Sequence, residues 1–484
     1  MNQDSNNKQQ WFEWEREATI HPILICLEAW MKPTKEYCGK GWPESYLFYK
    51  GDIIFWCTPL DKTEKYGEYL AKKYVQKENL KKLESDIQDI VKRLNGIFAK
   101  LDSIDISKLS DKQVYENYKL VKENFVEWFL PGALVEPIGL YGENKIRKIL
   151  IEKNVSDKNI EQYVSVLTTT PRRTFSKTEL EELLKIAMGE KLDDELEKHA
   201  KKYFWIHNNY FTTEVLNKEF FKNELVSLLS TNGKPMDYLE KLENDFKQIL
   251  EKKKELIKEL KLTTDETELI ELLEMFAWFQ DYRKEYIMKI LHYLDLMLGE
   301  IGKRRNLTLK QMKYSLASEI SSILDGSFDK SILDKRMKNF LALEGIEDEI
   351  RFEYHSGEDA IKRWKEVNPK IHRETEVLEI TGNPASRGVV EGFAKVTMNV
   401  SEAKNLKKGE ILITSMTTPD FVTAMKRAAA IVTNEGGILC HAAVVSREFG
   451  IPCVVGTKIA TKAIRTGDFI EVDGNKGIIR ILKR

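Results

Sequence analysis

The chain has few cysteines and no long apolar run. It contains five cysteines, an odd number, and no CxxC pair, so neither a disulfide framework nor a zinc site is expected. No stretch approaches the roughly 18 apolar residues that span a bilayer. The first ten residues are polar and lack the apolar core of a secretory signal. We therefore expect a cytoplasmic protein with no metal site and no membrane partner.

The chain also has almost no net charge. Its 76 basic and 77 acidic residues sum to −1 at pH 7. A protein that binds the nucleic-acid backbone usually has a basic excess, so no nucleic-acid partner is expected. A chain of 484 residues with 42% hydrophobic and 32% charged residues is typical of a globular protein with more than one domain.

The first three quarters of the chain have a helical pattern. Between Tyr238 and Leu260, apolar residues recur at steps of three, four and seven, which places them on one helical stripe. Thr263 and Glu266 have the spacing of a capping box, which predicts the start of another helix. Residues 80–101 and 176–188 show similar patterns.

The pattern changes near Val377. From there, glycine turns separate short β-type runs, which include Ile411–Thr414, Ala430–Thr433, Pro452–Gly456 and Phe469–Val472. Two helical runs interrupt them, around 420–429 and 441–449. We therefore expect an α plus α/β protein, with a mostly helical domain over 1–373 and a compact α/β domain over 374–484.

The segment 431–456 is the most informative part of the chain. Its pattern predicts a strand, a glycine turn, a short helix and a second strand. Gly436 and Gly437 let the backbone approach a ligand closely, because no Cβ is in the way. His441 falls in the first turn of the predicted helix, and Gly450 is placed to cap its end.

The start of this helix suits an anion. Its unpaired N–H groups and partial positive charge attract negative groups, and they favour a neutral, nucleophilic imidazole near pH 7. The same N–H groups help to hold a phosphate once the imidazole carries one. We therefore expect His441 to be the catalytic residue. Thr433, Gly436, Gly437 and Cys440 are the expected phosphate-binding residues.

Two other interpretations of this segment stay open. A lone histidine is most often structural. Cys440 also lies at the helix start, where a thiol pKa can fall, so a Cys–His nucleophile is a second option. The sequence identifies no third group to orient such a pair.

Several motifs follow one another in the C-terminal region. They are Gly382-Asn-Pro-Ala-Ser-Arg-Gly388, Glu391-Gly392, Lys408-Gly-Glu-Ile-Leu-Ile413, Thr418-Pro-Asp-Phe421, the segment Thr433–Gly456, Gly467 and Val472-Asp-Gly474. In this order they resemble the mobile, swivelling phosphohistidine domain of the PEP-utilising enzymes. That family includes phosphoenolpyruvate synthase, pyruvate phosphate dikinase, phenylphosphate synthase and rifampicin phosphotransferase. The resemblance implies that His441 is the residue that is phosphorylated.

Two positions depart from the synthase and dikinase pattern. Those enzymes usually have a basic residue in place of Glu435, and often a threonine in place of Leu439. Without that threonine, the regulatory phosphorylation of the dikinase is not possible. Both residues are closer to the branch that phosphorylates antibiotics and small molecules. Because an acidic side chain repels phosphate, we expect Glu435 to point away from it or to bind a cation.

The resemblance also predicts a division of labour. In the family, an ATP-grasp domain phosphorylates the histidine and a third domain presents the acceptor. The chain ends soon after Gly474, so a PEP-binding barrel is not expected. The N-terminal part shows no glycine-rich phosphate loops among strands, so an ATP-grasp module is not expected either, although a degenerate one stays open. ATP and Mg²⁺ are therefore expected on a partner subunit.

The helical region takes the place of the acceptor domain of rifampicin phosphotransferase. It resembles that enzyme weakly through residues 167–171 and 199–206. His207 is the candidate base for an acceptor hydroxyl. Trp205 is a candidate pocket wall and Arg172 a candidate anion ligand. A core position for the aromatic side chain and a solvated surface for the arginine are the alternatives.

Two functions from different classes follow. The first is a phosphotransferase component that takes a phosphoryl group from an ATP-grasp partner to a small hydroxylated acceptor. The second is a non-catalytic phosphocarrier or regulatory protein whose helical domain docks a partner protein. An aromatic-lined pocket of roughly 300 Å³ or more favours the first function, and a solid core with an exposed apolar patch favours the second.

Overall fold

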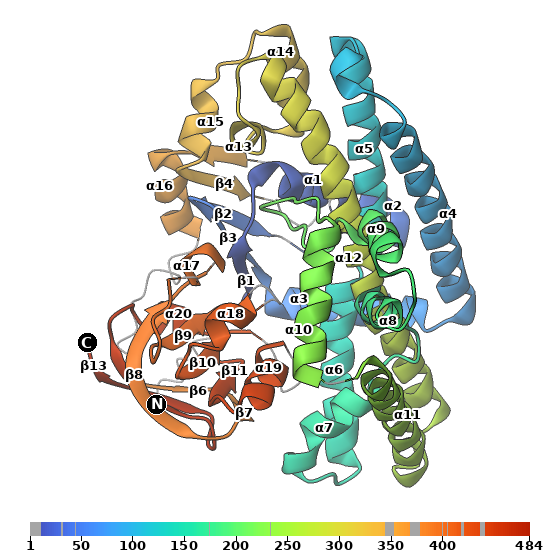
Figure 1. The fold of residues 1–484 in the computed structure, drawn as a ribbon, viewed down its shortest axis with the longest axis vertical. Helices are drawn as coiled ribbons and strands as arrows, with labels where there is room; N and C mark the ends of the chain where they lie inside the picture. The colour runs from blue at the N-terminus through green and yellow to red at the C-terminus, as the bar shows by residue number, and fades with distance from the viewer. Residues whose placement is uncertain are drawn as a thin grey trace, which may run out of the picture.

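A computed structural model gives the fold of the chain. It describes residues 11–30, 32–43, 45–173, 175–232, 234–343, 353–367, 378–398, 400–403, 405–417, 421–435 and 441–484. Two regions of different architecture occupy separate parts of the molecule (Figure 1). This α plus α/β organisation confirms the predicted fold class.

The N-terminal region is built mainly from helices. In chain order its elements are β1 (Trp11–Glu17), α1 (Ile20–Trp30), α2 (Lys32–Cys38), β2 (Tyr46–Lys50), β3 (Ile53–Pro59), α3 (Leu60–Tyr74), α4 (Lys77–Asp102), α5 (Asp111–Gly132), α6 (Val135–Glu152), α7 (Asp157–Leu167), α8 (Phe175–Ile186), α9 (Leu192–Tyr203), α10 (Lys218–Asn232), α11 (Pro235–Glu259), α12 (Thr264–Arg304), α13 (Leu309–Met312), α14 (Ile320–Asp325), α15 (Ser331–Arg336), β4 (Asn339–Leu343), β5 (Glu353–Ser356) and α16 (Glu358–Val367). The predicted helices over 80–101, 176–188 and 238–260 correspond to α4, α8 and α11.

Helix α12 is the longest helix among the described residues and runs through the centre of the helical region (Figure 1). It begins where the sequence predicts. The backbone N–H of Thr263 donates to the Glu266 carboxylate at 2.7 Å, and the Thr263 hydroxyl accepts from the Glu266 N–H at 3.3 Å. Its buried face, which includes Ile290 and Leu294, packs in one core with α5 and α6.

A sheet that the helical pattern did not predict joins the two ends of this region. Among the described residues it has the strand order β1-β3-β2-β4-β5, and all pairs are antiparallel. Strands β2 and β3 form a hairpin through Gly51 and Asp52, with Gly51 at φ +61°. Helix α16 covers the sheet, where Trp364 stacks on Phe48 with ring centroids 5.1 Å apart. This order makes β1 an edge strand.

The C-terminal region is a two-sided α/β structure. Its elements are β6 (Glu379–Thr381), β7 (Asn383–Ser386), β8 (Val389–Val396), α17 (Val400–Ala403), β9 (Ile411–Thr414), α18 (Val422–Met425), β10 (Ala430–Thr433), α19 (His441–Phe449), β11 (Cys453–Val455), α20 (Ala460–Ala463), β12 (Phe469–Asp473) and β13 (Ile478–Lys483). The predicted strands and both predicted helices are present.

The strands of this region form one sheet. Within the described residues its order is β6-β13-β12-β8-β9-β10-β11-β7, with parallel pairing from β8 to β11. Ala442 and Ala443 of α19 pack in the core on one face of the sheet. Ala460 and Ala463 of α20 pack in the core on the other face. A sheet covered on both faces suits parallel strands made almost wholly of apolar residues, such as β9 and β10.

Two motifs of this region meet in space. Gly474 donates its backbone N–H to the carbonyl of Gly388 at 2.8 Å. A Cβ at Gly474 would lie 2.2 Å from the carbonyl oxygen of Ser386, so no side chain fits there. The close approach explains why position 474 needs glycine, while Gly388 has φ +131°, a backbone conformation that favours glycine.

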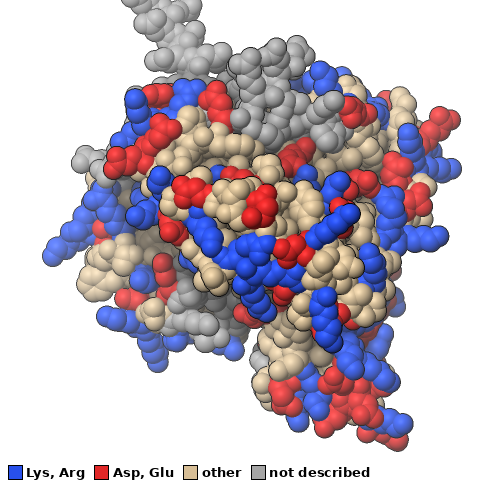
Figure 2. Space-filling view, turned by 90° about the horizontal axis from the view of Figure 1, so that it is seen from above, with Lys and Arg blue, Asp and Glu red and all other residues tan. Residues whose placement is uncertain are grey.

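The predicted boundary at 373/374 lies outside the described residues, between the end of α16 at Val367 and the start of β6 at Glu379. Its position therefore stays a prediction. None of the described helices is long and apolar enough to cross a membrane. On the face drawn in Figure 2, basic and acidic side chains are interspersed, in line with the balanced composition.

Candidate active site

The candidate site lies at one edge of the C-terminal sheet. The parallel strands β9 and β10 end together at Thr414 and Thr433. The loops that follow are joined by backbone hydrogen bonds, since Asn434 N–H donates to the Thr414 carbonyl at 3.1 Å and Glu435 N–H to the Ser415 carbonyl at 2.9 Å. The carboxyl ends of parallel strands are where open α/β sheets bind ligands.

Thr433 is part of the scaffold of this edge. Its side chain is 0% exposed, and its hydroxyl donates to the carbonyl of Glu435 at 2.6 Å. The Thr433 carbonyl accepts two hydrogen bonds from Thr457, one from its backbone N–H at 3.0 Å and one from the Thr457 hydroxyl at 2.9 Å. In this structure the Thr433 hydroxyl shapes the turn after β10, and its role as a phosphate donor stays a prediction.

Helix α19 begins at His441, as the sequence predicts. Gly450 follows its last residue with φ +63°, and Ile451 N–H donates to the Ser446 carbonyl at 2.9 Å. These two features form a Schellman-type end and confirm the predicted cap. The side chain of His441 and the residues Gly436, Gly437 and Cys440 lie outside the described part of the chain. Their roles in catalysis and phosphate binding stay predictions.

Glu435 connects this edge to the helical region. The Ser415 hydroxyl donates to its carboxylate at 3.1 Å, and the backbone N–H of Glu15 donates to the same carboxylate. Burial raises the pKa of Glu435, and the nearby Arg16 guanidinium and these two donors partly oppose that rise. The acidic side chain thus faces a cation, which is one of the two orientations that the sequence predicts.

Arg16 belongs to a group of polar side chains that we call the arginine cluster, made of Arg16, Glu136, Tyr210 and Arg283. Two nitrogens of Arg283 donate to the two Glu136 carboxylate oxygens at 3.0 and 2.7 Å. The segment that carries Tyr210 is fixed by its carbonyl, which accepts from the Thr19 N–H at 3.0 Å and hydroxyl at 2.9 Å. The cluster therefore joins β1, α6 and α12.

Glu136 stabilises the positive charge of Arg283, whereas the like charges of Arg16 and Arg283 oppose each other. Arg283 is 6% exposed, and although burial lowers its pKa, the Glu136 carboxylate more than offsets that effect. Burial raises the pKa of Tyr210 well above its usual value, so this residue stays a neutral phenol. Burial lowers the pKa of Arg16, while Tyr210, Glu435 and Glu136 oppose that change. Two cations and one carboxylate thus lie where the helical region meets Glu435.

The predicted acceptor residues lie in other surroundings. Trp205 is 1% exposed, its indole N–H donates to the Lys202 carbonyl at 2.8 Å, and it packs in a core with residues of α8, α9 and α10. His207 is half-buried, with its ring 4.8 Å from that of Phe220. The structure brings Trp205 and His207 together in one segment. Their assignment to an acceptor site stays a prediction.

Arg172 lies on the surface near α4 and α12. It pairs with Glu84 at 2.5 Å, and its guanidinium lies 4.8 Å from the ring centroid of Trp278. Both contacts hold the arginine within the helical region. Its predicted role as an anion ligand is not tested by these contacts.

The sequence patterns did not predict the arginine cluster. Arg16 lies on a strand within the region assigned to helices, and Glu136 and Arg283 are 147 residues apart. The aromatic residues Trp11, Phe12 and Trp14 favour a strand, a signal that could have placed Glu15 and Arg16 on an extended segment. No local signal joins Arg283 to Glu136.

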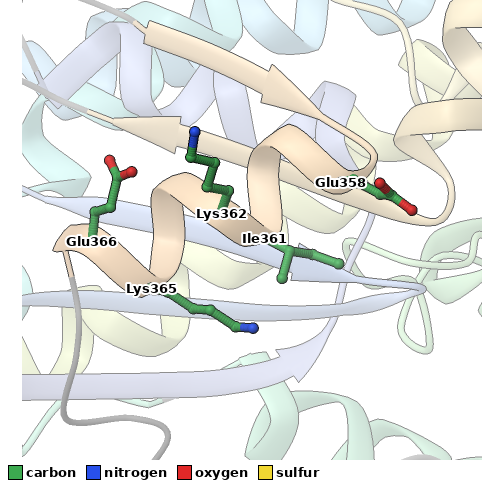
Figure 3. A pocket seen from close by; sticks show the side chains of 5 residues that line it. All are labelled: Glu358, Ile361, Lys362, Lys365 and Glu366. Carbon is green, nitrogen blue, oxygen red and sulfur yellow. The ribbon is translucent and has the colours of Figure 1, made fainter.

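Two surface hollows lie elsewhere among the described residues. One, with a volume of about 570 Å³, is lined by Glu358, Ile361, Lys362, Lys365 and Glu366, all on α16 (Figure 3). The other, about 450 Å³, is lined mainly by residues 407–410 and 466–467 with Phe393 and Ala394. Neither is lined by the predicted acceptor residues. Within the described part of the chain, no group of three or more His, Cys, Asp or Glu side chains is placed to hold a metal.

Comparison with known proteins assigns the C-terminal region. The family model described as "PEP-utilising enzyme, mobile domain" matches residues 406–477. The chain is 51% identical over 119 residues to a probable phosphoenolpyruvate synthase of Archaeoglobus fulgidus, covering 24% of this chain and 16% of that protein. It is 56% identical over 106 residues to the phosphoenolpyruvate synthase of Pyrococcus furiosus, covering 22% and 13%.

A third relative extends further along the chain. The chain is 28% identical over 319 residues to the rifampicin phosphotransferase of Bacillus cereus, covering 63% of this chain and 36% of that protein. This alignment is longer than the C-terminal region, so it includes part of the helical region. The chain spans only 13–16% of the length of the two synthases. The part of the chain that contains β10 and α19 is thus similar to the mobile domain of the PEP-utilising enzymes.

Proposed function

We propose that the chain is a phosphotransferase component that carries a phosphoryl group on His441. The observation that carries the proposal is a mobile domain of this family in which α19 begins at His441, at the carboxyl edge of the parallel strands. A helix start at such an edge supplies N–H donors and a partial positive charge for an anion. The donor is ATP on an ATP-grasp partner, and the acceptor is a small hydroxylated molecule.

Two transfers make up the reaction. In the first, an imidazole nitrogen of His441 attacks a phosphorus of the ATP polyphosphate, a P–N bond forms, the bridging P–O bond breaks and the remaining nucleotide leaves. In the second, an acceptor oxygen attacks the phosphorus, the P–N bond breaks and a base takes the hydroxyl proton. Mg²⁺ bound with ATP on the partner offsets the charge of the phosphates. Catalysis then depends on placing donors around the phosphoryl group.

The residues of this chain divide between the two transfers. Thr433, Gly436, Gly437 and Cys440 bind the phosphate around His441. His207 is the proposed base for the acceptor hydroxyl, beside Trp205 and Arg172. The alignment with rifampicin phosphotransferase, which extends into the helical region, supports an acceptor role for that region.

A non-catalytic phosphocarrier is the second candidate. The observation that favours it is the burial of Trp205, a proposed wall of the acceptor pocket, in a packed core. In that case the helical domain would dock a partner protein, and the phosphoryl group on His441 would pass to that protein or act as a signal.

The test is phosphorylation of the full chain. We would incubate it with ATP and Mg²⁺, alone and with an ATP-grasp partner, and follow the intact mass and acid lability of any adduct. An acid-labile adduct that requires the partner supports the proposal. An adduct without the partner would mean that the chain itself uses ATP. No adduct under either condition would contradict a phosphohistidine carrier with ATP as donor.

A further inference from the structure

Strand β1 has a free edge among the described residues. It is the terminal strand of its sheet and pairs only with β3 there, in a register that aligns Glu15 with Phe55 and Arg16 with Ile54. Along the free edge of such a strand, every second N–H group points away from the sheet and needs another acceptor. The N-terminal sheet therefore offers backbone donors on one side.

The mobile domain supplies the acceptor for one of these donors. The N–H of Glu15 donates to the side chain of Glu435, the second residue after β10. Within its own domain Glu435 is held by Ser415 at 3.1 Å through the side chain and 2.9 Å through the backbone. The carboxylate is thus presented to β1 from a fixed turn.

Charge strengthens this contact. Arg16, the next residue on β1, attracts Glu435, whereas the like charge of Arg283 lies close enough to lower the pKa of Arg16. Arg283 is in turn anchored to Glu136 of α6 by two hydrogen bonds. The attraction between Arg16 and Glu435 adds to the hydrogen bond from Glu15 and favours the docked arrangement. A lysine or arginine at position 435, the pattern of the synthases and the dikinase, would reverse the sign of this interaction.

We propose that Glu435, Glu15 and Arg16 form a docking latch that holds the mobile domain against the helical domain. Glu435 and Arg16 are positioning residues, and the latch sets where the turn after β10 lies relative to the arginine cluster. The latch gives the phosphoryl carrier of the proposed function a defined resting position. The contact itself exists without phosphorylation, so it can be tested separately from the transfer reaction.

A latch of this kind competes with the ATP-grasp partner. Docked molecules hold Glu435, in the turn after β10, against β1, and in the proposal only undocked molecules are free to meet the partner. Weakening the latch therefore raises the fraction that the partner can phosphorylate. A substitution that merely damages the fold would lower that rate instead.

Hydrogen exchange of the Glu15 amide tests the latch directly. The full, unphosphorylated chain would be compared with Glu435→Ala, Glu435→Gln and Arg16→Lys. Glu471→Ala is the matched control, because Glu471 pairs with Arg480 at 2.6 Å within the mobile domain. Amides that pair β1 with β3 report whether the sheet stays folded. The initial rate of phosphorylation by the partner is the second readout.

The latch predicts that Glu435→Ala speeds exchange at Glu15 about tenfold or more, while the β1–β3 amides and the control are unchanged. In Glu435→Gln, which keeps an acceptor, and in Arg16→Lys, which keeps the charge, exchange at Glu15 is faster than in the parent chain and slower than in Glu435→Ala. Phosphorylation by the partner becomes several-fold faster in Glu435→Ala. Unchanged exchange at Glu15 in Glu435→Ala, or an equal effect in Glu471→Ala, would overturn the latch. Failure of phosphorylation in every variant, with the exchange pattern intact, would reject the proposed function and leave the latch standing.

Discussion

The carboxylate of Glu435 accepts a hydrogen bond from the backbone N–H of Glu15, although the two residues lie at opposite ends of the chain. One comes from the turn that leads to His441, and the other from an edge strand of the helical region. The contact gives a physical reason for an acidic residue close in sequence to His441, the proposed site of phosphorylation. The Glu435 carboxylate faces strand β1, which carries Arg16.

The pH dependence of stability gives one test of the surroundings of β1. Burial raises the pKa of Glu17 to about 7, and the carboxylates of Asp52 and Glu402 add to the rise. Because the folded-state pKa exceeds the unfolded value near 4.5, ionisation destabilises the folded state. The free energy of unfolding should therefore fall as the pH rises from about 4.5 to about 7.

Replacing Glu17 with Gln removes that loss. We expect the variant to be more stable than the parent chain at pH 8 by on the order of 2 kcal/mol, and the difference to shrink toward pH 4. Denaturant unfolding at both pH values measures it. A difference that stays constant with pH would contradict the assigned environment of Glu17.

The ion pair between Arg283 and Glu136 should contribute to the free energy of unfolding. Arg283→Met leaves the half-buried Glu136 carboxylate without its partner, and we expect a loss of up to about 3–5 kcal/mol, the range of fully buried pairs. The double variant with Glu136→Gln should recover part of that loss. Arg147→Met is the matched control, because the pair of Arg147 with Glu143 is solvent-exposed and should contribute less than about 1 kcal/mol. Equal losses at both sites would show that burial does not set the cost.

Close packing of α3 against α6 gives a further test. A Cβ at Gly67 would lie 2.1 Å from the carbonyl oxygen of Pro137, so Gly67→Ala must force the two helices apart. We expect a loss of about 1–3 kcal/mol in the free energy of unfolding. At Gly96 of α4 a Cβ meets nothing within 4 Å, so Gly96→Ala should stabilise by about 0.5–1 kcal/mol. Thermal unfolding distinguishes the two, and the same sign for both would refute the packing argument.

Local signals predicted much of the fold. The Thr263–Glu266 capping box marks the start of α12, and Gly450 marks the end of α19, because both act through neighbouring backbone groups. The strands of the mobile domain were also predicted, since short apolar runs between glycine turns are typical of strands. These elements depend on residues close together in sequence.

Long-range contacts were not predictable in the same way. The sheet of the helical region joins β2 to β4, which follows almost 290 residues later, and neither strand has enough local pattern to name its partner. The hairpin turn at Gly51 and Asp52 was a signal for β2 and β3 that the helical interpretation passed over. The meeting of Glu435 with β1 depends on how two separately folded regions dock, which periodicity does not encode.

The central claim is that His441 carries the phosphoryl group, and peptide mapping tests it most directly. The full chain would be phosphorylated with ATP, Mg²⁺ and an ATP-grasp partner, digested at neutral pH and sequenced by mass spectrometry, beside His441→Ala and Cys440→Ser. We predict one phosphorylated peptide with the modification on His441, lost in His441→Ala and kept in Cys440→Ser. A phosphoryl group on Cys440, or one that persists in His441→Ala, would contradict the account.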